Sequence, residues 1–393
     1  MLLFFILILI FLYFYNMYYK HIGFSALLIF FISTVCLSLF SFECIYREID
    51  YFLSDELYYI NFALDKVPYH VDRFLWFFIN DLILNHDISL NNFALKIINI
   101  PIAACLLIVL WLIFRDKRVF WIPIILPYFA LIATKNIRDI PIFLFTALTS
   151  FLFHHPKPIY VVFGLISLTM LFLLRPFAAG VLFIILLIQI SFFTIKPIYR
   201  FKISKKHLIK VFLIFIICLS ILPITLPSFK TLTARYYDWY IYTTGEGRSM
   251  MERNGVQSDP LYASGSKTRD FLVAGIRYAV TPIPTSLIKR ALEGGSSWGI
   301  VDDLIRVINQ IGYYLMILFL IINAQYIHTV FLKLAPSGKA IIMSLLTYWP
   351  IYSWHLYGVT HQRLKLPLQI VVFLIAMGVL EYKKNYRMSF MKS

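Results

Sequence analysis

Long runs of apolar residues alternate along this chain with short polar connections. A helix needs about 20 apolar residues to cross the hydrocarbon core of a bilayer, with somewhat fewer tolerated. The pattern therefore predicts an all-α fold, a polytopic transmembrane helix bundle of about eleven spans that forms one integral membrane domain over residues 1–393. The predicted spans are residues 2–18, 23–42, 97–114, 119–133, 140–153, 159–174, 177–194, 211–226, 307–327, 340–358 and 367–381. Arg175 and Pro176 divide one long apolar run, and the proline favours a break there.

Composition supports a membrane protein and excludes a soluble domain. Hydrophobic residues make up 60% of the chain and charged residues only 14%, where a soluble domain carries about a quarter charged residues. Residues 1–18 lack a charged n-region and a small-residue cleavage site, so we expect a retained helix rather than a signal peptide. The four cysteines show no paired spacing and indicate neither a disulfide framework nor a metal knuckle.

The positions of the basic residues predict the orientation in the membrane. Residues 196–210 hold six lysines and arginines and no acid, which is typical of a cytoplasmic loop. Counting spans from this loop places four further basic connections on the same side, at residues 115–118, 157, 333–339 and 383–392. We therefore expect a multi-pass protein of the bacterial inner membrane, with the N-terminus extracytoplasmic and the C-terminus cytoplasmic. Topology also explains the net charge of +16, so nucleic acid is not an expected partner.

Two long segments then lie on the extracytoplasmic side. Residues 43–96 form the first extracytoplasmic loop and hold nine acids against four basic residues, with an amphipathic-looking stretch at 74–96 that could lie along the interface. Residues 227–306 form a large extracytoplasmic loop that is polar, aromatic and nearly balanced in charge. A loop of that length is usually functional or partly folded.

The first segment contains the best candidates for acid–base chemistry, in the sequence Ser54-Asp55-Glu56-Leu57-Tyr58-Tyr59. A carboxylate in a partly dry cleft can accept the proton of an acceptor hydroxyl. Adjacent carboxylates cannot both face one pocket on a regular element, so we expect Asp55 to be the catalytic base and Glu56 to be a supporting group. The alternative is a solvated acidic loop that helps to set the topology.

The Asp-Glu-x-x-Tyr pattern of Asp55, Glu56 and Tyr59 resembles the acidic signature of GT-C glycosyltransferases, which are polytopic enzymes. The resemblance implies a sugar donor on a polyprenyl-phosphate carrier and a substrate-binding role for Tyr59. In this chain the loop follows the second predicted span, whereas the commoner pattern has it after the first. The N-terminal helix is then an addition, or the span count differs by one.

Two basic motifs fall on the same predicted side. Lys135-Asn136-Ile137-Arg138-Asp139 lies between apolar runs, and a guanidinium such as that of Arg138 can bind phosphate in a bidentate fork. The alternative is an interfacial Arg138–Asp139 pair. The stretch 361–368 resembles the His-x-Arg-x-Arg-x-Pro segment of GT-C enzymes, which implies roles for His361 in substrate binding and for Arg363 and Lys365 in donor-phosphate binding. Lys365 replaces an arginine and supplies charge without the fork, and the alternative is a misassigned cytoplasmic loop.

Further basic residues complete the candidate set. Arg175 sits inside an apolar run, where a lone arginine is a candidate phosphate ligand or a snorkelling side chain. In the large loop, Arg235, Arg248 and Arg277 are candidates for binding the glycan. The stretch 269–284 resembles O-antigen and capsular polysaccharide polymerases.

The sequence has no glycine-rich nucleotide motif and no metal signature, so no cofactor is predicted. A divalent ion held between Asp55 and the donor phosphate is an alternative that the sequence does not exclude. His154-His155 is expected to be an ordinary loop pair.

These features lead to one functional hypothesis and several alternatives. Activated sugar outside the cytoplasm must arrive on a lipid carrier, so the chain is expected to transfer sugar or oligosaccharide repeats from a polyprenyl-(pyro)phosphate donor to a growing glycan acceptor. We favour a repeat polymerase of O-antigen or capsule biosynthesis over a single-sugar transferase. The membrane lipid and the lipid-linked oligosaccharide are the expected partners. A lipid-linked oligosaccharide flippase and a scaffold subunit are the alternatives outside catalysis.

Overall fold

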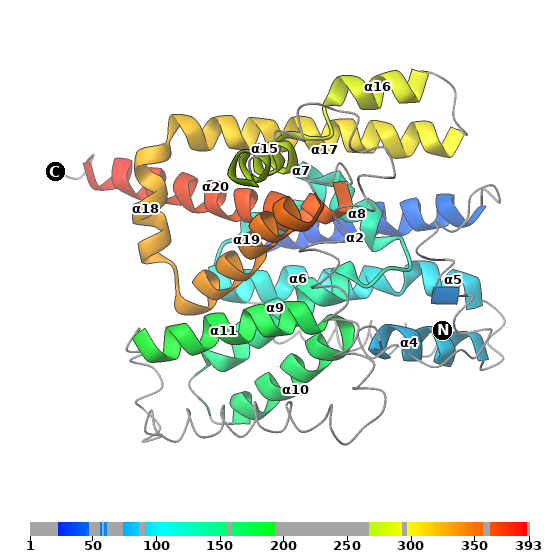
Figure 1. Ribbon diagram of the computed structural model, residues 1–393, viewed down its shortest axis with the longest axis horizontal. Coiled ribbons are helices and arrows are strands. Elements are labelled where there is room, and N and C mark those ends of the chain that lie inside the picture. Colours follow the sequence, from blue (N-terminus) through cyan, green and yellow to red (C-terminus); the bar gives the residue numbers. More distant parts are fainter. Residues whose placement is uncertain are drawn as a thin grey trace.

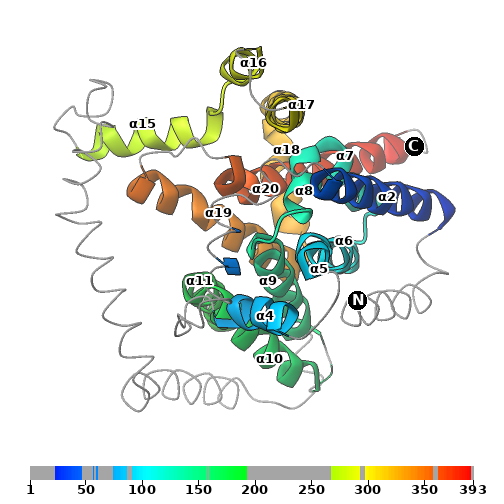
Figure 2. The same cartoon turned by 90° about the vertical axis from the view of Figure 1, so that its right-hand side faces the viewer.

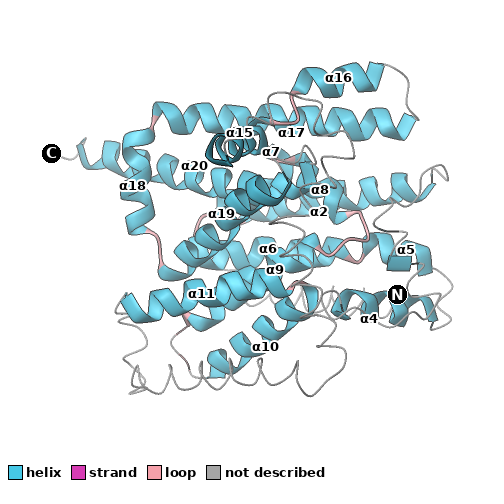
Figure 3. Ribbon diagram, viewed as in Figure 1, coloured by secondary structure: helices cyan, strands magenta, loops and turns pink. Residues whose placement is uncertain are grey.

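The computed structural model describes residues 23–46, 56, 59–60, 74–85, 91–155, 157, 159–192, 267–292, 297–356 and 362–390. These residues form helices joined by short connections and contain no strand, so the predicted all-α class is confirmed for the described part of the chain (Figure 3). The helices of the first half are α2 (Phe24–Tyr46), α4 (Phe74–Asn85), α5 (Asn91–Ile97), α6 (Asn99–Phe114), η2 (Lys117–Trp121), α7 (Ile122–Ile125), α8 (Pro127–Ala133), α9 (Asp139–Phe153), α10 (Ile159–Leu174) and α11 (Pro176–Phe192). Those of the second half are α15 (Lys267–Val280), α16 (Pro284–Leu292), α17 (Ser297–Ile322), α18 (Ala324–Lys333), α19 (Pro336–Leu356) and α20 (Gln362–Phe390).

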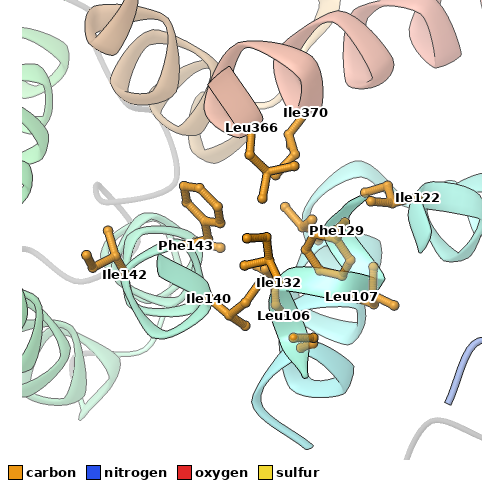
Figure 4. Close-up of a cluster of buried hydrophobic side chains, with 14 of the residues drawn as sticks. Leu106, Leu107, Ile122, Phe129, Ile132, Ile140, Ile142, Phe143, Leu366 and Ile370 are labelled. Atoms are coloured by element: carbon orange, nitrogen blue, oxygen red, sulfur yellow. The ribbon is translucent and has the colours of Figure 1, made fainter. Parts of the chain in front are cut away.

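Helix α6 lies near the centre of the bundle, and its apolar side chains are almost all buried. It packs against α9, while α20 contacts α17, α18 and α19 (Figures 1 and 2). The core between them is made of aliphatic and aromatic side chains from α6, α7, α8, α9 and α20 (Figure 4). It includes Leu107, Phe129, Ile140 and Leu366, each no more than 1% exposed.

Peripheral helices expose apolar side chains that a soluble protein would bury. Phe24 and Phe31 on α2 are 80% and 64% exposed, and Ile321 and Ile322 on α17 are 66% and 71% exposed. Large exposed apolar surfaces of this kind mark contact with a membrane or a partner. On a helix within a bilayer, these side chains would face lipid.

Four helical stretches of the described chain are long and apolar enough to cross a membrane. They are Phe24–Glu43, Ala94–Phe114, Gly299–Ile322 and Arg363–Lys384. Shorter apolar helices accompany them, including α9, α10 and α11. The structure therefore supports a membrane protein, while the count of about eleven spans stays a prediction. The predicted spans 2–18 and 211–226 lie outside the described residues.

One predicted span is wrong as a single helix. Residues 119–133 are divided among η2, α7 and α8, with Leu126 in a non-helical conformation between α7 and α8. The cause is local, because Pro123 and Pro127 each lack an N–H donor and each occupy one of the first two positions of their helix. The predicted break at Arg175 is confirmed, since α10 ends at Leu174 and α11 begins at Pro176.

The two predicted external segments contain helices of their own. Within 43–96 lie α4 and α5, and α4 packs against α5 and α10. In the large loop, the stretch 269–284 falls on α15 and the start of α16. Residues 297–306, assigned to this loop by hydropathy, instead form the first turns of α17. These residues include Asp302, Asp303 and Arg306. The three charges interrupt the apolar run, so the hydropathy pattern placed the start of the predicted span at residue 307.

Candidate functional site

A buried carboxylate connects the acidic motif to the rest of the molecule. The Glu56 side chain is fully buried, and Lys96 Nζ on α5 lies 3.0 Å from each of its carboxylate oxygens. The backbone N–H of Asn136 donates to Glu56 Oε1 at 2.5 Å. A buried charge requires a counter-ion and hydrogen bonds. Glu56 therefore attaches the acidic motif both to α5 and to the loop between α8 and α9.

That loop, residues 134–138, runs largely through the protein interior, so its backbone groups need partners. The amide nitrogen of Asn99, at the start of α6, donates to the carbonyl oxygens of Lys135 at 2.7 Å and Ile137 at 2.6 Å. The Asn136 amide donates to Asn80 Oδ1 on α4 at 2.5 Å. Polar side chains on α4 and α6 thus hold the loop that carries Arg138.

Two arginines lie at the start of α9, and a third follows the residue that one of them contacts. Arg138 Nη1 donates to the carbonyl oxygen of Leu174, the last residue of α10, at 2.6 Å. Arg175 follows directly in the chain, and its guanidinium carbon lies 5.7 Å from the ring centroid of Tyr348 on α19. Arg363, on the first turn of α20, places Nε 3.4 Å from Asp139 Oδ2. Basic residues separated by more than 200 positions therefore gather beside one helix start.

A second ion-pair group adjoins this cluster. Lys135 Nζ lies 3.3 Å from Asp302 Oδ1, and Arg306 pairs with the other oxygen of Asp302 one turn along α17. The Arg306 guanidinium carbon lies 5.4 Å from the ring centroid of Tyr128. The Tyr128 hydroxyl is within electrostatic range of both the Asp302–Arg306 and the Asp139–Arg363 pairs. The two groups therefore share one polar region.

Lys365 has a different environment from the arginines. Its side chain is 2% exposed, and its ammonium group donates to the backbone carbonyl and the hydroxyl of Thr281 and, at 3.4 Å, to the carbonyl of Arg277. These are acceptors at the C-terminal end of α15, where a cation is favoured. Lys365, predicted to bind donor phosphate, instead fastens α15 to α20.

The remaining predicted residues divide into two groups. Tyr59 is 5% exposed and packs its ring 5.5 Å from that of Phe77, an aromatic contact within the core. Arg277 lies on the last turn of α15, beside the Lys365 attachment. The other predicted residues lie outside the described part of the chain: Asp55, Arg235, Arg248 and His361.

Several residues of the site were not singled out from sequence. They are Asn80, Lys96, Asn99, Tyr128, Asp302 and Arg306. The i,i+4 pair Asp302–Arg306, set in a largely apolar helix, was a detectable signal. Lys96 gave no such signal, because a lone lysine at the end of an acidic segment is typical of the protein surface. Its partner lies 40 positions earlier in the chain.

Counting residues places this site at one end of the bundle. Along α20, Arg363 and Lys384 are 21 positions apart, which is roughly 31 Å at the rise of an α-helix. On α5 and α6, Lys96 and Arg115 are 19 positions apart, roughly 28 Å. Both spacings are close to the thickness of a bilayer's hydrocarbon core, about 30 Å. The polar site and the basic residues at the far ends of these helices are thus separated by about one membrane (Figure 1).

The site contains two buried asparagine side-chain oxygens. Asn99 Oδ1 and Asn136 Oδ1 are buried and have no hydrogen-bond partner among the described residues. Such atoms in native proteins mark places for water or a ligand. No group of three or more metal-binding side chains occurs in the ranges that the structure describes.

Comparison with protein-family models finds no match to this chain, and comparisons with curated proteins and with solved structures find none either.

Proposed function

We propose that this chain is an integral membrane glycosyltransferase of surface polysaccharide assembly, which takes sugar or oligosaccharide repeats from a polyprenyl-(pyro)phosphate donor on the extracytoplasmic face. One observation supports the proposal above the others. Arg138 and Arg363, which come from separate motifs, lie at the start of α9, and Arg175 directly follows the residue that Arg138 contacts. The loop that carries Arg138 also binds Glu56 of the acidic motif. Guanidinium groups suit a phosphate leaving group, and a carboxylate motif beside them suits acid–base chemistry.

In this reaction the acceptor hydroxyl oxygen attacks the anomeric carbon of the donor sugar. The bond between that carbon and the phosphate oxygen breaks, and the electron pair leaves with the lipid (pyro)phosphate. The Asp55 carboxylate takes the hydroxyl proton. A single displacement of this kind inverts the anomeric centre.

The arginines stabilise the charge that develops on the leaving phosphate. Each guanidinium has five N–H donors. Arg138 uses one of them to bind the carbonyl oxygen of Leu174, which fixes the position of its side chain. Glu56 acts as a positioning residue, because its bonds to Lys96 and Asn136 hold the chain next to Asp55 against the arginine-bearing loop. Lys365 positions α15, which carries Arg277.

Within this class we favour transfer of whole lipid-linked repeats onto one another. The arginine-bearing segment 227–306, with Arg235, Arg248 and Arg277, then binds the glycan portion. A transporter would be expected to place charges near the middle of its spans. The described ion pairs of the site lie instead at one end of the helices, which favours the enzyme.

Substitutions at two positions test the assignment of roles. Asp55→Asn should abolish polymer formation while the amount of protein in the membrane stays normal. Arg363→Ala should lower turnover of a synthetic lipid-linked repeat by about 10²- to 10³-fold, the usual effect of removing one oxyanion donor. Arg363→Lys should fall between, because it keeps the charge but loses the fork. Lys157→Ala, which removes an exposed charge between α9 and α10, is the control.

Full activity of the Asp55→Asn variant would refute the assignment of Asp55 as the catalytic base. Unchanged turnover by the Arg363→Ala variant would refute the contact between Arg363 and the donor phosphate. A strain that lacks this protein distinguishes a polymerase from a flippase. Lipid-linked repeats that accumulate on the outer leaflet indicate a polymerase, whereas repeats retained on the inner leaflet indicate a flippase.

A further inference from the structure

A cavity of about 800 Å³ lies at the end of the bundle opposite the candidate site. It is formed where the end of α6 and the residues before η2 meet α18 and the last turns of α20 (Figure 1, left side). Its basic residues belong to the connections that the charge pattern assigns to the cytoplasmic face. None of its residues takes part in the site described above.

Basic side chains outnumber acids around the cavity by five to two. Both acids contact the same arginine. Arg118 Nε donates to Asp116 at 2.9 Å, and Arg118 Nη2 donates to Glu381 at 2.8 Å. In the described ranges, no carboxylate lies within 4 Å of the charged groups of Arg115 or Lys384. The cavity therefore has a surplus of positive charge that its own acids do not neutralise.

Part of the cavity lining is apolar. Phe114, Val330, Leu374 and Met377 line it together with the basic residues. Along α20, Leu374 precedes Lys384 by ten positions, which is roughly 15 Å. The lining thus changes from apolar to basic along the helix axis, in the direction from the bundle centre to its end.

We propose that this cavity binds an anionic phospholipid. The lipid phosphate contacts Arg115, Lys333 and Lys384, while the glycerol and upper acyl chain lie against Leu374 and Met377. Basic pockets between helices at the cytoplasmic side of a membrane are suited to anionic headgroups. The positive-inside pattern accounts for basic residues on this face, but it requires neither a cavity nor an apolar wall beside them. A soluble anion would leave that wall without a partner.

Binding to the purified full-length protein tests the proposal. Thermal unfolding in a neutral detergent is followed with increasing phosphatidylglycerol, phosphatidylcholine or inorganic phosphate. Phosphatidylglycerol should raise the Tm of the wild type, and the other two should not. Near a membrane surface each basic side chain contributes about 1 kcal/mol, so each removed cation should weaken the apparent affinity about fivefold.

The variants are chosen to preserve the fold. Arg115 has a positive φ of 56°, a conformation that asparagine tolerates, so Arg115→Asn removes the charge without new backbone strain. Lys384→Gln changes an exposed side chain, and Lys157→Gln removes an exposed charge outside the cavity as the matched control. The double variant of Arg115 and Lys384 should require about 25-fold more phosphatidylglycerol for the same Tm shift, while the control matches the wild type.

Three results would overturn the proposal. An equal shift with phosphatidylcholine would show that acyl chains alone account for it. An equal shift with inorganic phosphate would show a site for a free anion. An unaltered response of the double variant to phosphatidylglycerol would show that the lipid binds elsewhere. None of these measurements depends on glycosyl transfer, so they stand apart from the proposed reaction.

Discussion

Replacing Lys96 with methionine would leave the Glu56 carboxylate buried without its lysine counter-ion. The two side chains are 4% and 0% exposed, and Nζ lies 3.0 Å from both carboxylate oxygens, so solvent screens the pair little. Removing one partner of a buried pair typically costs about 3–5 kcal/mol, because the other charge stays desolvated. Methionine has nearly the length of lysine, so lost packing should add less than about 1.5 kcal/mol.

The matched partner is Glu56→Gln combined with Lys96→Met. Glutamine keeps the shape of glutamate and retains an oxygen that accepts the Asn136 N–H. Replacing both members of a buried pair by neutral groups of similar volume is often nearly neutral. We therefore expect each single variant to lose at least about 3 kcal/mol and the double variant to come within about 2 kcal/mol of the wild type.

The free energy of unfolding would be measured in mixed micelles of dodecyl maltoside and SDS, with tryptophan fluorescence as the readout. Additive losses in the double variant would refute the reasoning, as would a Lys96→Met protein as stable as the wild type. Activity gives a second readout of the same variants. If Glu56 acts by positioning, the double variant should recover part of the transfer activity that each single variant loses. The Asp55→Asn variant should stay inactive.

Other predictions concern the packing around the site. Gly312→Ala should destabilise the protein by about 1–3 kcal/mol, because a Cβ there would lie 2.6 Å from the carbonyl oxygen of Ile125. Gly180→Ala, on α11 with nothing within 4 Å, should be neutral or stabilise by up to about 1 kcal/mol, and the same unfolding assay compares the two. Asn99→Ala should cost about 2–3 kcal/mol, because two buried carbonyl oxygens of the loop 134–138 lose their donor. Equal stability of Gly312→Ala and Gly180→Ala, or of Asn99→Ala and the wild type, would contradict these packing arguments.

Local patterns predicted much of the helical framework. Apolar runs located α2, α6, α9, α10 and α11 to within a few residues, because hydrophobic continuity and helix length are properties of contiguous sequence. The Arg175–Pro176 break followed from the missing N–H of proline. The effect of proline in residues 119–133 was underestimated, because Pro123 and Pro127 divide that run into short helices.

The helical class, the membrane character of the chain and the residue types of the candidate site could all be predicted from contiguous stretches of sequence. Which of these residues meet became visible only in the folded chain. Glu56 pairs with Lys96, Arg363 with Asp139 and Lys135 with Asp302, at separations of 40 to 224 positions. The folded chain also shows that Lys365 fastens α15 and that the residues around Arg115 and Lys384 enclose a cavity. The physical reason is that hydropathy and helix propensity act between near neighbours. The pairing of buried charges depends instead on which helix ends pack together, and the chain order does not state this.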